Sequence, residues 1–324
     1  MSRLRSVPTP VSVPASGALV LMSMLWGSTF FMNKELVATM PPGDLTALRF
    51  GIAALVLMAL AHRQLAMSAA TLGKGLVIGS VFAVSQLLQT FGLVRTSASI
   101  SGFLTGLYVV LTPLGSALLM RRRLPLSLAG SVCLAALALG VLTLGHGGPG
   151  GGFGIGEFLT IGCAVGFACH ILVTGAWVRP ENVMQITVVQ TATVALWSLP
   201  AALPGGLAIP HGAVQWAAVG YLAVLCSCLT MFLQSWAQAR TDETRAAVIM
   251  SAEPAWSAVF AILAGQEALR ARTVLGGLLM LAAMWLAIAA PALPRWRTHR
   301  RAGRVPGRTF SARSAESTAG SRGH

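Results

Sequence analysis

The sequence predicts an all-α polytopic membrane protein in which ten transmembrane helices form two inverted five-helix repeats. Of its 324 residues, 55% are hydrophobic and only 10% are charged, whereas charged residues make up roughly a quarter of a soluble domain. The 58 residues between Glu181 and Arg240 contain no Asp, Glu, Lys or Arg. Because a helix needs about 20 apolar residues to cross a bilayer, runs of this length favour several helical spans. They also lack the period-two alternation of outer-membrane strands.

Each predicted helix is an apolar run that ends at a charged, polar or Pro/Gly-rich break. The helices are expected over residues 17–33, 45–61, 72–94, 98–120, 126–145, 156–178, 184–203, 214–237, 246–264 and 273–291. The clearest breaks are Pro41-Pro42, Pro125, the glycine-rich run 147–156 and Pro204-Gly205-Gly206. The domain organisation is then a leader (1–16), a first repeat (17–145), a linker (146–155), a second repeat (156–291) and a basic tail (292–324).

Basic residues predict the orientation in the membrane. With the N-terminus inside, the cytoplasmic segments hold 18 of the 23 Lys and Arg residues, and ten against five when the tail is left out. Both termini are then cytoplasmic, and we expect a multi-pass protein of the cytoplasmic membrane of a bacterium. The tail is Gly/Ser-rich and carries eight arginines, a composition typical of a disordered segment near anionic lipid headgroups and not of a nucleic-acid-binding domain.

The chain contains an internal repeat. Residues Gln89–Thr96 match Gln234–Thr241 at an offset of 145, while Thr112-Pro113 matches Glu253-Pro254 at an offset of 141. Residues 45–49 match residues 186–190 at the same offset of 141. An odd number of helices inverts the second half, which would put Arg95 outside and Arg240 inside. Inverted repeats are typical of secondary transporters, whose substrate site lies near the middle of the bilayer between the halves.

Several segments resemble EamA-type proteins of the drug/metabolite transporter superfamily. The resemblance covers roughly residues 17–291 and implies ten helices and the export of amino acids or other small metabolites. The matching segments are Trp26–Phe30, Leu48–Phe50, Arg95–Pro113, Thr244–Ala247 and the stretch from Glu253-Pro254 to Gln266–Leu269. One departure is Arg121–Arg123, which stands where many members have an acidic turn.

Glu253 is the candidate with the clearest chemistry. It lies eight residues, about 12 Å, beyond the expected start of its helix, where an ionisable group costs on the order of 2.5–3.5 kcal/mol. Pro254 follows it and removes a backbone donor, so a helix break is expected there, and Pro113 is the matching candidate in the first repeat. We expect Glu253 to carry a coupling proton or to contact an amine of the substrate. The alternative is a structural hydrogen bond to a neighbouring helix.

Other polar residues share one face of their helix at spacings of three and four. Such faces point into a helix bundle and not to lipid, so they line a cavity or bond neighbouring helices. The candidates of this kind are Trp26, Thr29 and Asn33 in the first helix, Ser85, Gln86 and Gln89 in the third, and Thr230 and Gln234 in the eighth.

Four isolated residues, and the repeat counterpart of one of them, complete the set of candidate site residues. Arg49 is expected either to pair with an acid such as Asp44 or to contact an anionic group of the substrate, and Gln190 is its repeat counterpart. His170 is expected to donate one structural hydrogen bond or to act as a proton relay. Two aromatic residues beside the prolines, Tyr108 and Trp256, are candidates for the substrate pathway or for packing.

The function predicted from these features is secondary transport of a small molecule by alternating access, with amino-acid or metabolite export as the leading interpretation and protons as a candidate coupling ion. Drug efflux and a passive channel are the alternatives. An enzyme is not expected, because HExxH, a pair of intramembrane aspartates and a Gly-x-Ser-x-Gly elbow are all missing from the sequence. The five cysteines form no CxxC motif, so we expect no metal or cofactor. Apart from Arg49 the spans hold almost no cation, which argues against phosphorylated cargo.

Overall fold

The computed structural model describes residues 13–120, 126–143, 154–202, 206–265, 268 and 271–289. Across these residues the chain is helical and contains no strand, which confirms the predicted all-α class. Residues 1–12, most of the linker, Arg121–Arg123, Gln266-Glu267 and the basic tail lie outside the described part. What the sequence predicts for them therefore stays a prediction.

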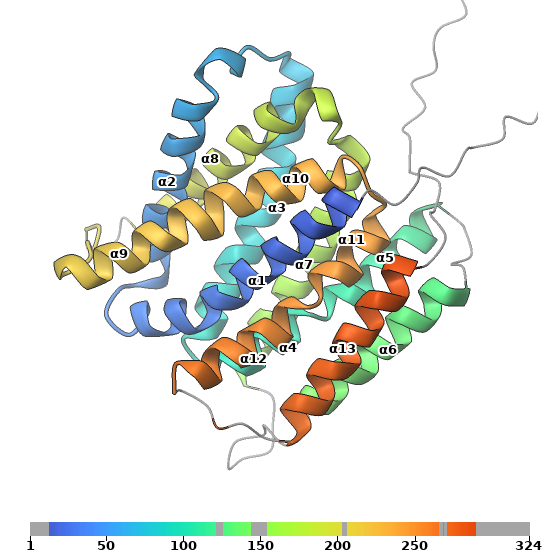
Figure 1. Cartoon of the computed structure of the whole chain (residues 1–324). Helices are drawn as coiled ribbons and strands as arrows, with labels where there is room; N and C mark the ends of the chain where they lie inside the picture. The colour runs from blue at the N-terminus through green and yellow to red at the C-terminus, as the bar shows by residue number, and fades with distance from the viewer. Residues whose placement is uncertain are drawn as a thin grey trace, which may run out of the picture.

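The helices follow the predicted order, and successive segments run in alternating directions along the bundle (Figure 1). The first half contains α1 (Val13–Leu36), α2 (Pro42–Leu60), α3 (Ala69–Leu93), the pair α4 (Ala98–Thr105) and α5 (Tyr108–Met120), and α6 (Leu126–Thr143). The second half contains α7 (Ile155–Trp177), α8 (Val183–Ala202), α9 (Gly212–Ala223), the π-helical turn η3 (Val224–Leu229), α10 (Thr230–Gln238), the pair α11 (Glu243–Met250) and α12 (Glu253–Leu263), and α13 (Ala271–Ala289). Single 3-10 turns, η1 (His62–Gln64) and η2 (Pro180–Asn182), precede α3 and α8.

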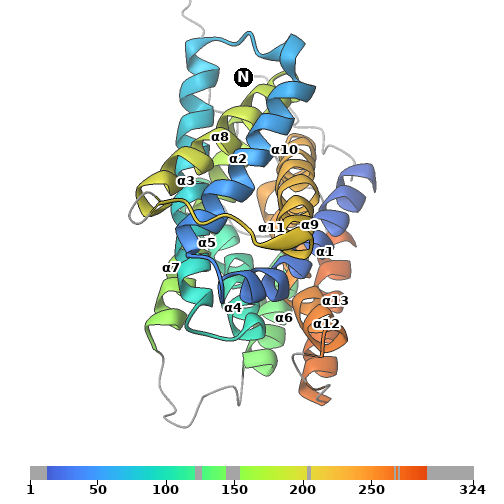
Figure 2. The same ribbon diagram turned by 90° about the vertical axis from the view of Figure 1, so that its left-hand side faces the viewer.

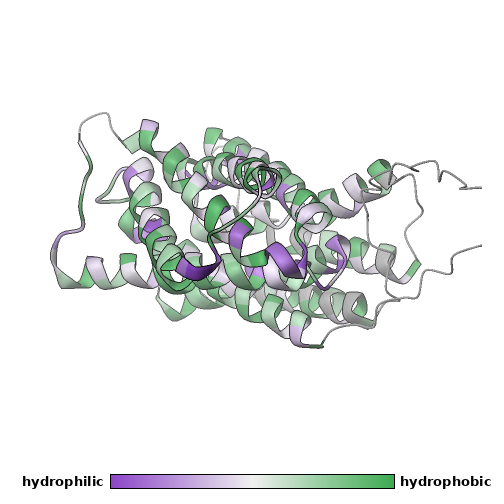
Figure 3. Cartoon of the chain, turned by 90° about the horizontal axis from the view of Figure 1, so that it is seen from above, coloured by the Kyte–Doolittle hydropathy of each residue, from purple (hydrophilic) through white to green (hydrophobic). Residues whose placement is uncertain are grey.

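Eight segments of the described chain are long and apolar enough to cross a membrane. The remaining two, α6 and α13, contain the shorter apolar stretches Ala129–Ala138 and Val274–Ala283. The chain is therefore a multi-pass helical protein, while ten crossings stay a prediction. Coloured by hydropathy, the bundle is largely hydrophobic, with only short hydrophilic segments (Figure 3).

The fourth and ninth predicted helices are each broken into two. The breaks fall at residues 106–107 and 251–252, at a repeat offset of 145, and each preceding half-helix begins with the same kind of cap. Ser97 accepts the N–H of Ile100 at the start of α4, and Asp242 accepts the N–H of Arg245 at the start of α11. Side-chain acceptors of this kind satisfy the free N–H groups of the first helical turn.

Two sequence-based expectations are wrong at these breaks. Pro254 stands at the second position of α12, next to its break, but Pro113 lies well inside α5 and breaks nothing. The equivalence of Thr112-Pro113 with Glu253-Pro254 fails as well, because the helix bounds pair Tyr108 with Glu253. The offset is 141 or 142 at the bounds of the first two helices of each repeat, and 145 at the end of the third helix and at the start of each later helix.

The two halves are interlocked by their first helices. In the first half, α1 packs against α12 and α10, while its repeat counterpart α7 packs against α3 and α5. Counterparts also pack on each other, α2 on α8 and α6 on α13, the latter pair standing side by side at one edge of the bundle (Figures 1 and 2). In this arrangement, the centre of the bundle lies between α1, α2, α3, α7 and α12. The polar candidate residues gather there.

Candidate functional site

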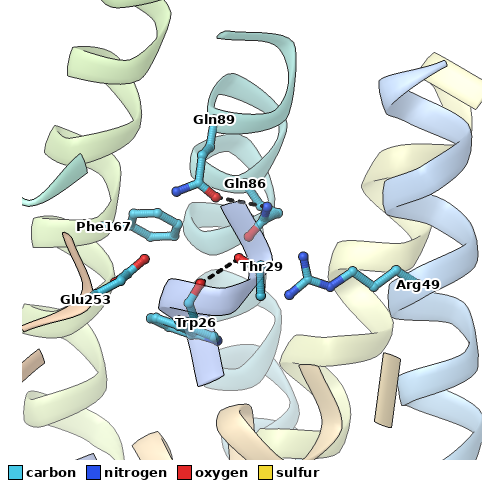
Figure 4. A pocket seen from close by; sticks show the side chains of 7 residues that line it. All are labelled: Trp26, Thr29, Arg49, Gln86, Gln89, Phe167 and Glu253. Atoms are coloured by element: carbon cyan, nitrogen blue, oxygen red, sulfur yellow. Dashed lines mark hydrogen bonds between the residues drawn. The ribbon is translucent and has the colours of Figure 1, made fainter. Parts of the chain in front are cut away.

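A small pocket lies at this centre and is lined from five helices (Figure 4). Its free space holds about one water molecule, so the described conformation is closed around it. The lining residues are Trp26 and Thr29 from α1, Arg49 from α2, Gln86 and Gln89 from α3, Phe167 from α7, and Glu253 from α12. Apart from Phe167, all of them are predicted candidates.

Arg49 enters the pocket with its side chain 4% exposed. Its Nε donates to Ser227 Oγ at 2.6 Å, and its Nη2 donates to the carbonyl oxygen of Cys226 at 3.0 Å. The predicted alternative of a pair with Asp44 is wrong, because Asp44 Oδ2 instead accepts the backbone N–H of Ala208. Among the described residues, Arg49 has no acidic partner and its Nη1 has no hydrogen-bond partner.

Glu253 reaches the pocket from the first position of α12 and is also 4% exposed. Its Oε2 accepts a long hydrogen bond, 3.4 Å, from the hydroxyl group of Tyr108. These two residues occupy equivalent positions of the repeat, 145 residues apart, so they meet across the boundary between the halves. In Figure 4, Glu253 and Arg49 point toward the middle of the pocket from opposite sides.

Two aromatic side chains form one wall of the pocket. Trp26 stacks on Phe167 with ring centroids 6.3 Å apart, and these residues are again repeat counterparts, at an offset of 141. The indole Nε1 donates to Thr230 Oγ1 at 2.9 Å and to the carbonyl of Cys226 at 3.2 Å. Thr230 is thus brought to the pocket indirectly, through Trp26.

The polar wall comes from α1 and α3. The amide of Gln86 donates to Gln89 Oε1 at 3.2 Å, and Gln89 donates to Thr105 in α4 at 3.2 Å. Thr29 donates to the carbonyl of Trp26 in its own helix at 2.8 Å, which leaves the hydroxyl oxygen free to accept. The wall therefore offers amide and hydroxyl groups that can donate to or accept from a small polar ligand.

A second polar cluster, separate from this pocket, contains three more candidates. His170 Nε2 contacts Gln190 Oε1 at 3.1 Å, and its Nδ1 contacts Gln234 Nε2 at 3.5 Å. Gln190 donates onward to Ser235 at 2.9 Å, and the ring of His170 packs on Phe82. The oxygen of Gln234 is buried without a partner among the described residues. This network is consistent with the structural interpretation of His170.

The remaining candidates lie outside the pocket. Asn33 is buried one turn further along α1, and Ser85 donates to the carbonyl of Val81 in its own helix. Trp256 lines an apolar groove between α12 and α13, not the polar pocket. The missed residue, Phe167, could have been found from the repeat, because it is the counterpart of Trp26. Among the described residues, no group of three His, Cys, Asp or Glu side chains is arranged to hold a metal ion.

Both halves of the chain, residues 15–144 and 154–289, match the model of the EamA-like transporter family. The chain belongs to the EamA-like transporter family. The predicted resemblance is thereby confirmed, and membership points to a membrane transporter of small molecules and not to an enzyme. The central pocket is then the candidate substrate site of an EamA-like transporter.

The chain is also similar to two known proteins. An uncharacterized transporter of Archaeoglobus fulgidus is 28% identical over 274 residues, which cover 82% of this chain and 83% of that protein. A solved crystal structure superposes with a TM-score of 0.66 over 85% of this chain and 97% of that one. At 21% identity, this second similarity shows the fold alone.

Proposed function

We propose that this EamA-like transporter exports amino acids across the cytoplasmic membrane by alternating access, and that Glu253 exchanges the proton that couples transport. The observation that carries the proposal is the pair of opposite charges in one pocket. Arg49 and Glu253 both line it, both are nine-tenths buried, and the structure gives neither an ion-pair partner among the described residues.

An unpaired charge buried at membrane depth is costly, so a ligand that completes it gains affinity. Arg49 suits the α-carboxylate, because a guanidinium presents parallel donors to both carboxylate oxygens. Glu253 suits the α-ammonium group, or a proton when the site is empty. In the same pocket, Trp26 and Phe167 offer an apolar surface for the side chain of the substrate. A zwitterion with an apolar side chain fits this arrangement better than a phosphate, which would need further cations.

The closed pocket fits an alternating-access cycle. A space for about one water molecule cannot hold an amino acid, so loading and release require the helices around it to separate first on one side and then on the other. Because α1 and α7 are repeat counterparts, each packed against the opposite half, exchanging their packing would open the pocket in opposite directions. The excess of basic residues in the expected cytoplasmic loops favours cytoplasmic termini.

The test is counterflow in proteoliposomes with L-phenylalanine, L-leucine and L-phenylalaninamide. We expect trans-loaded L-phenylalanine and L-leucine to accelerate uptake of labelled L-phenylalanine, and the carboxamide to do so at least tenfold more weakly. Arg49→Gln should remove this preference for the carboxylate. If no amino acid exchanges, or if uptake shows no trans-acceleration, as in a channel, amino-acid transport by alternating access is wrong.

The coupling role of Glu253 is tested with an imposed pH gradient. Wild-type efflux should accelerate when the gradient drives protons against the direction of the substrate. Glu253→Gln should lose this response, because an amide cannot exchange a proton. Tyr108→Phe, which removes the hydroxyl partner of Glu253 but keeps the carboxyl, is the control and should keep the response. A pH response that survives in Glu253→Gln would remove the proton from the proposal and leave the amine contact.

A further inference from the structure

The turn η3 breaks the regular hydrogen bonding of the long helix formed by α9 and α10. At its end, the backbone N–H of Thr230 donates to Ser227, three residues back, and not to Cys226, four residues back. The carbonyl oxygen of Cys226 is thereby available to side chains. Short π-helical turns inside α-helices are often found at functional sites, and this one lies beside the pocket.

Three side chains use the freed Cys226 carbonyl. It accepts from Thr230 Oγ1 at 2.7 Å, from Arg49 Nη2 at 3.0 Å and from Trp26 Nε1 at 3.2 Å. The adjacent hydroxyl of Ser227 donates to Leu222 O at 2.9 Å, so its lone pairs are free to accept Arg49 Nε at 2.6 Å. The π turn therefore fixes both the charged group and the aromatic ring that line the pocket.

The geometry leaves one edge of the guanidinium free. The Nε and Nη2 groups form one edge of the planar fork, and both are bound to the turn. The opposite edge, made by Nη1 and the second N–H of Nη2, is left for the pocket. Two parallel donors on a planar edge match the two oxygens of a carboxylate.

Among the described residues, the π turn occurs in the second half and has no equivalent in the first. Its repeat counterpart, residues 79–84, is uninterrupted α-helix within α3, where Phe82 stands in place of Ser227. The counterpart of Arg49 is Gln190, which bonds His170 and Ser235 and not α3. The π turn and the arginine thus occur together in one half and are both replaced in the other.

We propose that the π turn is the element that makes the site selective for carboxylates, with Ser227 as the positioning residue that aims Arg49. The carboxylate is held by the free edge of the guanidinium only while Ser227 Oγ and the Cys226 carbonyl hold the other edge. This inference rests on the proposed function, because it needs Arg49 to contact the carboxylate of the substrate.

The experiment compares L-phenylalanine with L-phenylalaninamide in proteoliposomes, measuring KM and kcat of efflux for each. Ser227→Ala should raise KM for the acid roughly tenfold, leave KM for the amide within about twofold, and leave kcat for both nearly unchanged, since a hydrogen bond to a charged group has about that effect. Ser227→Thr restores the hydroxyl and should recover the acid preference to within about threefold.

The control is Ser198→Ala in α8, a buried serine that bonds only the carbonyl of Val194 in its own helix. It should change neither KM. If Ser227→Ala does not reconstitute, Ser227→Cys provides the same comparison with a weaker acceptor. Unchanged acid preference in the Ser227 variants, with that preference lost in Arg49→Gln, overturns the π-turn inference alone. Acid preference that survives in Arg49→Gln overturns the contact on which the proposed function depends.

Discussion

At the scale of single residues, the site contrasts two ways of keeping a charge inside a membrane protein. Arg49 is held by neutral oxygen acceptors of a neighbouring helix, and Glu253 by one phenol at 3.4 Å. Neutral acceptors offset part of the desolvation cost of a cation but leave its charge uncompensated. A side chain kept in that state is ready for an anionic ligand.

Asp242 gives a prediction about pH. Burial raises the pKa of its carboxyl, more than the N–H and guanidinium of Arg245 lower it. A folded-state pKa above the unfolded value means that the native protein binds this proton more tightly. The contribution to stability is therefore present at low pH and is lost as the pH rises from the ordinary value of 3.8 through the folded value.

Asp242→Asn keeps a side-chain oxygen that can cap α11, but its amide group cannot ionise. We expect its melting temperature in detergent to fall less than that of the wild type between about pH 4 and about pH 7. Asp242→Ala, which removes the cap, should be less stable than Asp242→Asn at every pH, by about 1 kcal/mol. Parallel melting curves for the wild type and Asp242→Asn across this range would contradict the assignment.

At the scale of helices, the sequence predicts well where each helix lies along the chain. It predicts poorly whether a helix is continuous or broken. Apolar runs and Pro/Gly breaks locate every helical segment to within a few residues, because the membrane requires long apolar stretches. The breaks within the fourth and ninth predicted helices do not follow the prolines: they share one repeat position, yet only Pro254 lies near it. The half-helices at both breaks pack across the boundary between the halves, α4 on α12 and α11 on α5. The same limit applies to η3, whose side-chain partners come from α1 and α2.

Gly27 gives a prediction about helix packing. A Cβ atom at this position of α1 would overlap the Cβ of Trp256 and approach backbone atoms of Ser257 and Glu253 in α12. Gly27→Ala should therefore destabilise the protein by about 1–3 kcal/mol, despite the better helix propensity of alanine.

Gly17, in the same helix, has nothing within 4 Å of such an atom. Gly17→Ala should therefore match or exceed the wild type in thermal melting. Equal melting temperatures for the two variants would mean that α1 does not pack on α12 as closely as described.

At the scale of the whole molecule, the inverted repeat helps to explain which site residues can be recognised from the sequence. Polar residues such as Gln86, Gln89 and Glu253 stand out in apolar helices, so the sequence predicts them directly. Phe167 does not stand out, because an aromatic residue in a buried helix is ordinary packing. Trp256 has suitable chemistry but faces α13, and the rotation of a helix about its axis is not readable from spacing alone.

The repeat also predicts the topology. In the structure, α3 and α10 run in opposite directions and finish at opposite ends of the bundle (Figure 2). Arg95 and Arg240, just beyond these ends, should therefore lie on opposite sides of the membrane. We expect a membrane-impermeant thiol reagent to label Arg95→Cys in intact cells and Arg240→Cys only in inside-out vesicles.

Both engineered cysteines are introduced into the double variant Cys133→Ser/Cys169→Ser. This variant lacks the two exposed native thiols, and the other three native thiols are buried. Labelling of both engineered cysteines from one side would be incompatible with an inverted arrangement.

The interlocking of the first helices has a consequence for biosynthesis. The packing partner of Gly27 in α1 is α12, which begins at Glu253. At about 5–20 residues per second, the ribosome needs roughly 10–50 s to reach that partner. During that time the newly inserted α1 must remain in lipid, or beside the translocon or an insertion chaperone, without its final neighbour. If the ribosome stalls near the middle of the message, α1 stays without its packing partner α12. We therefore expect the nascent first half to be a substrate for membrane quality control.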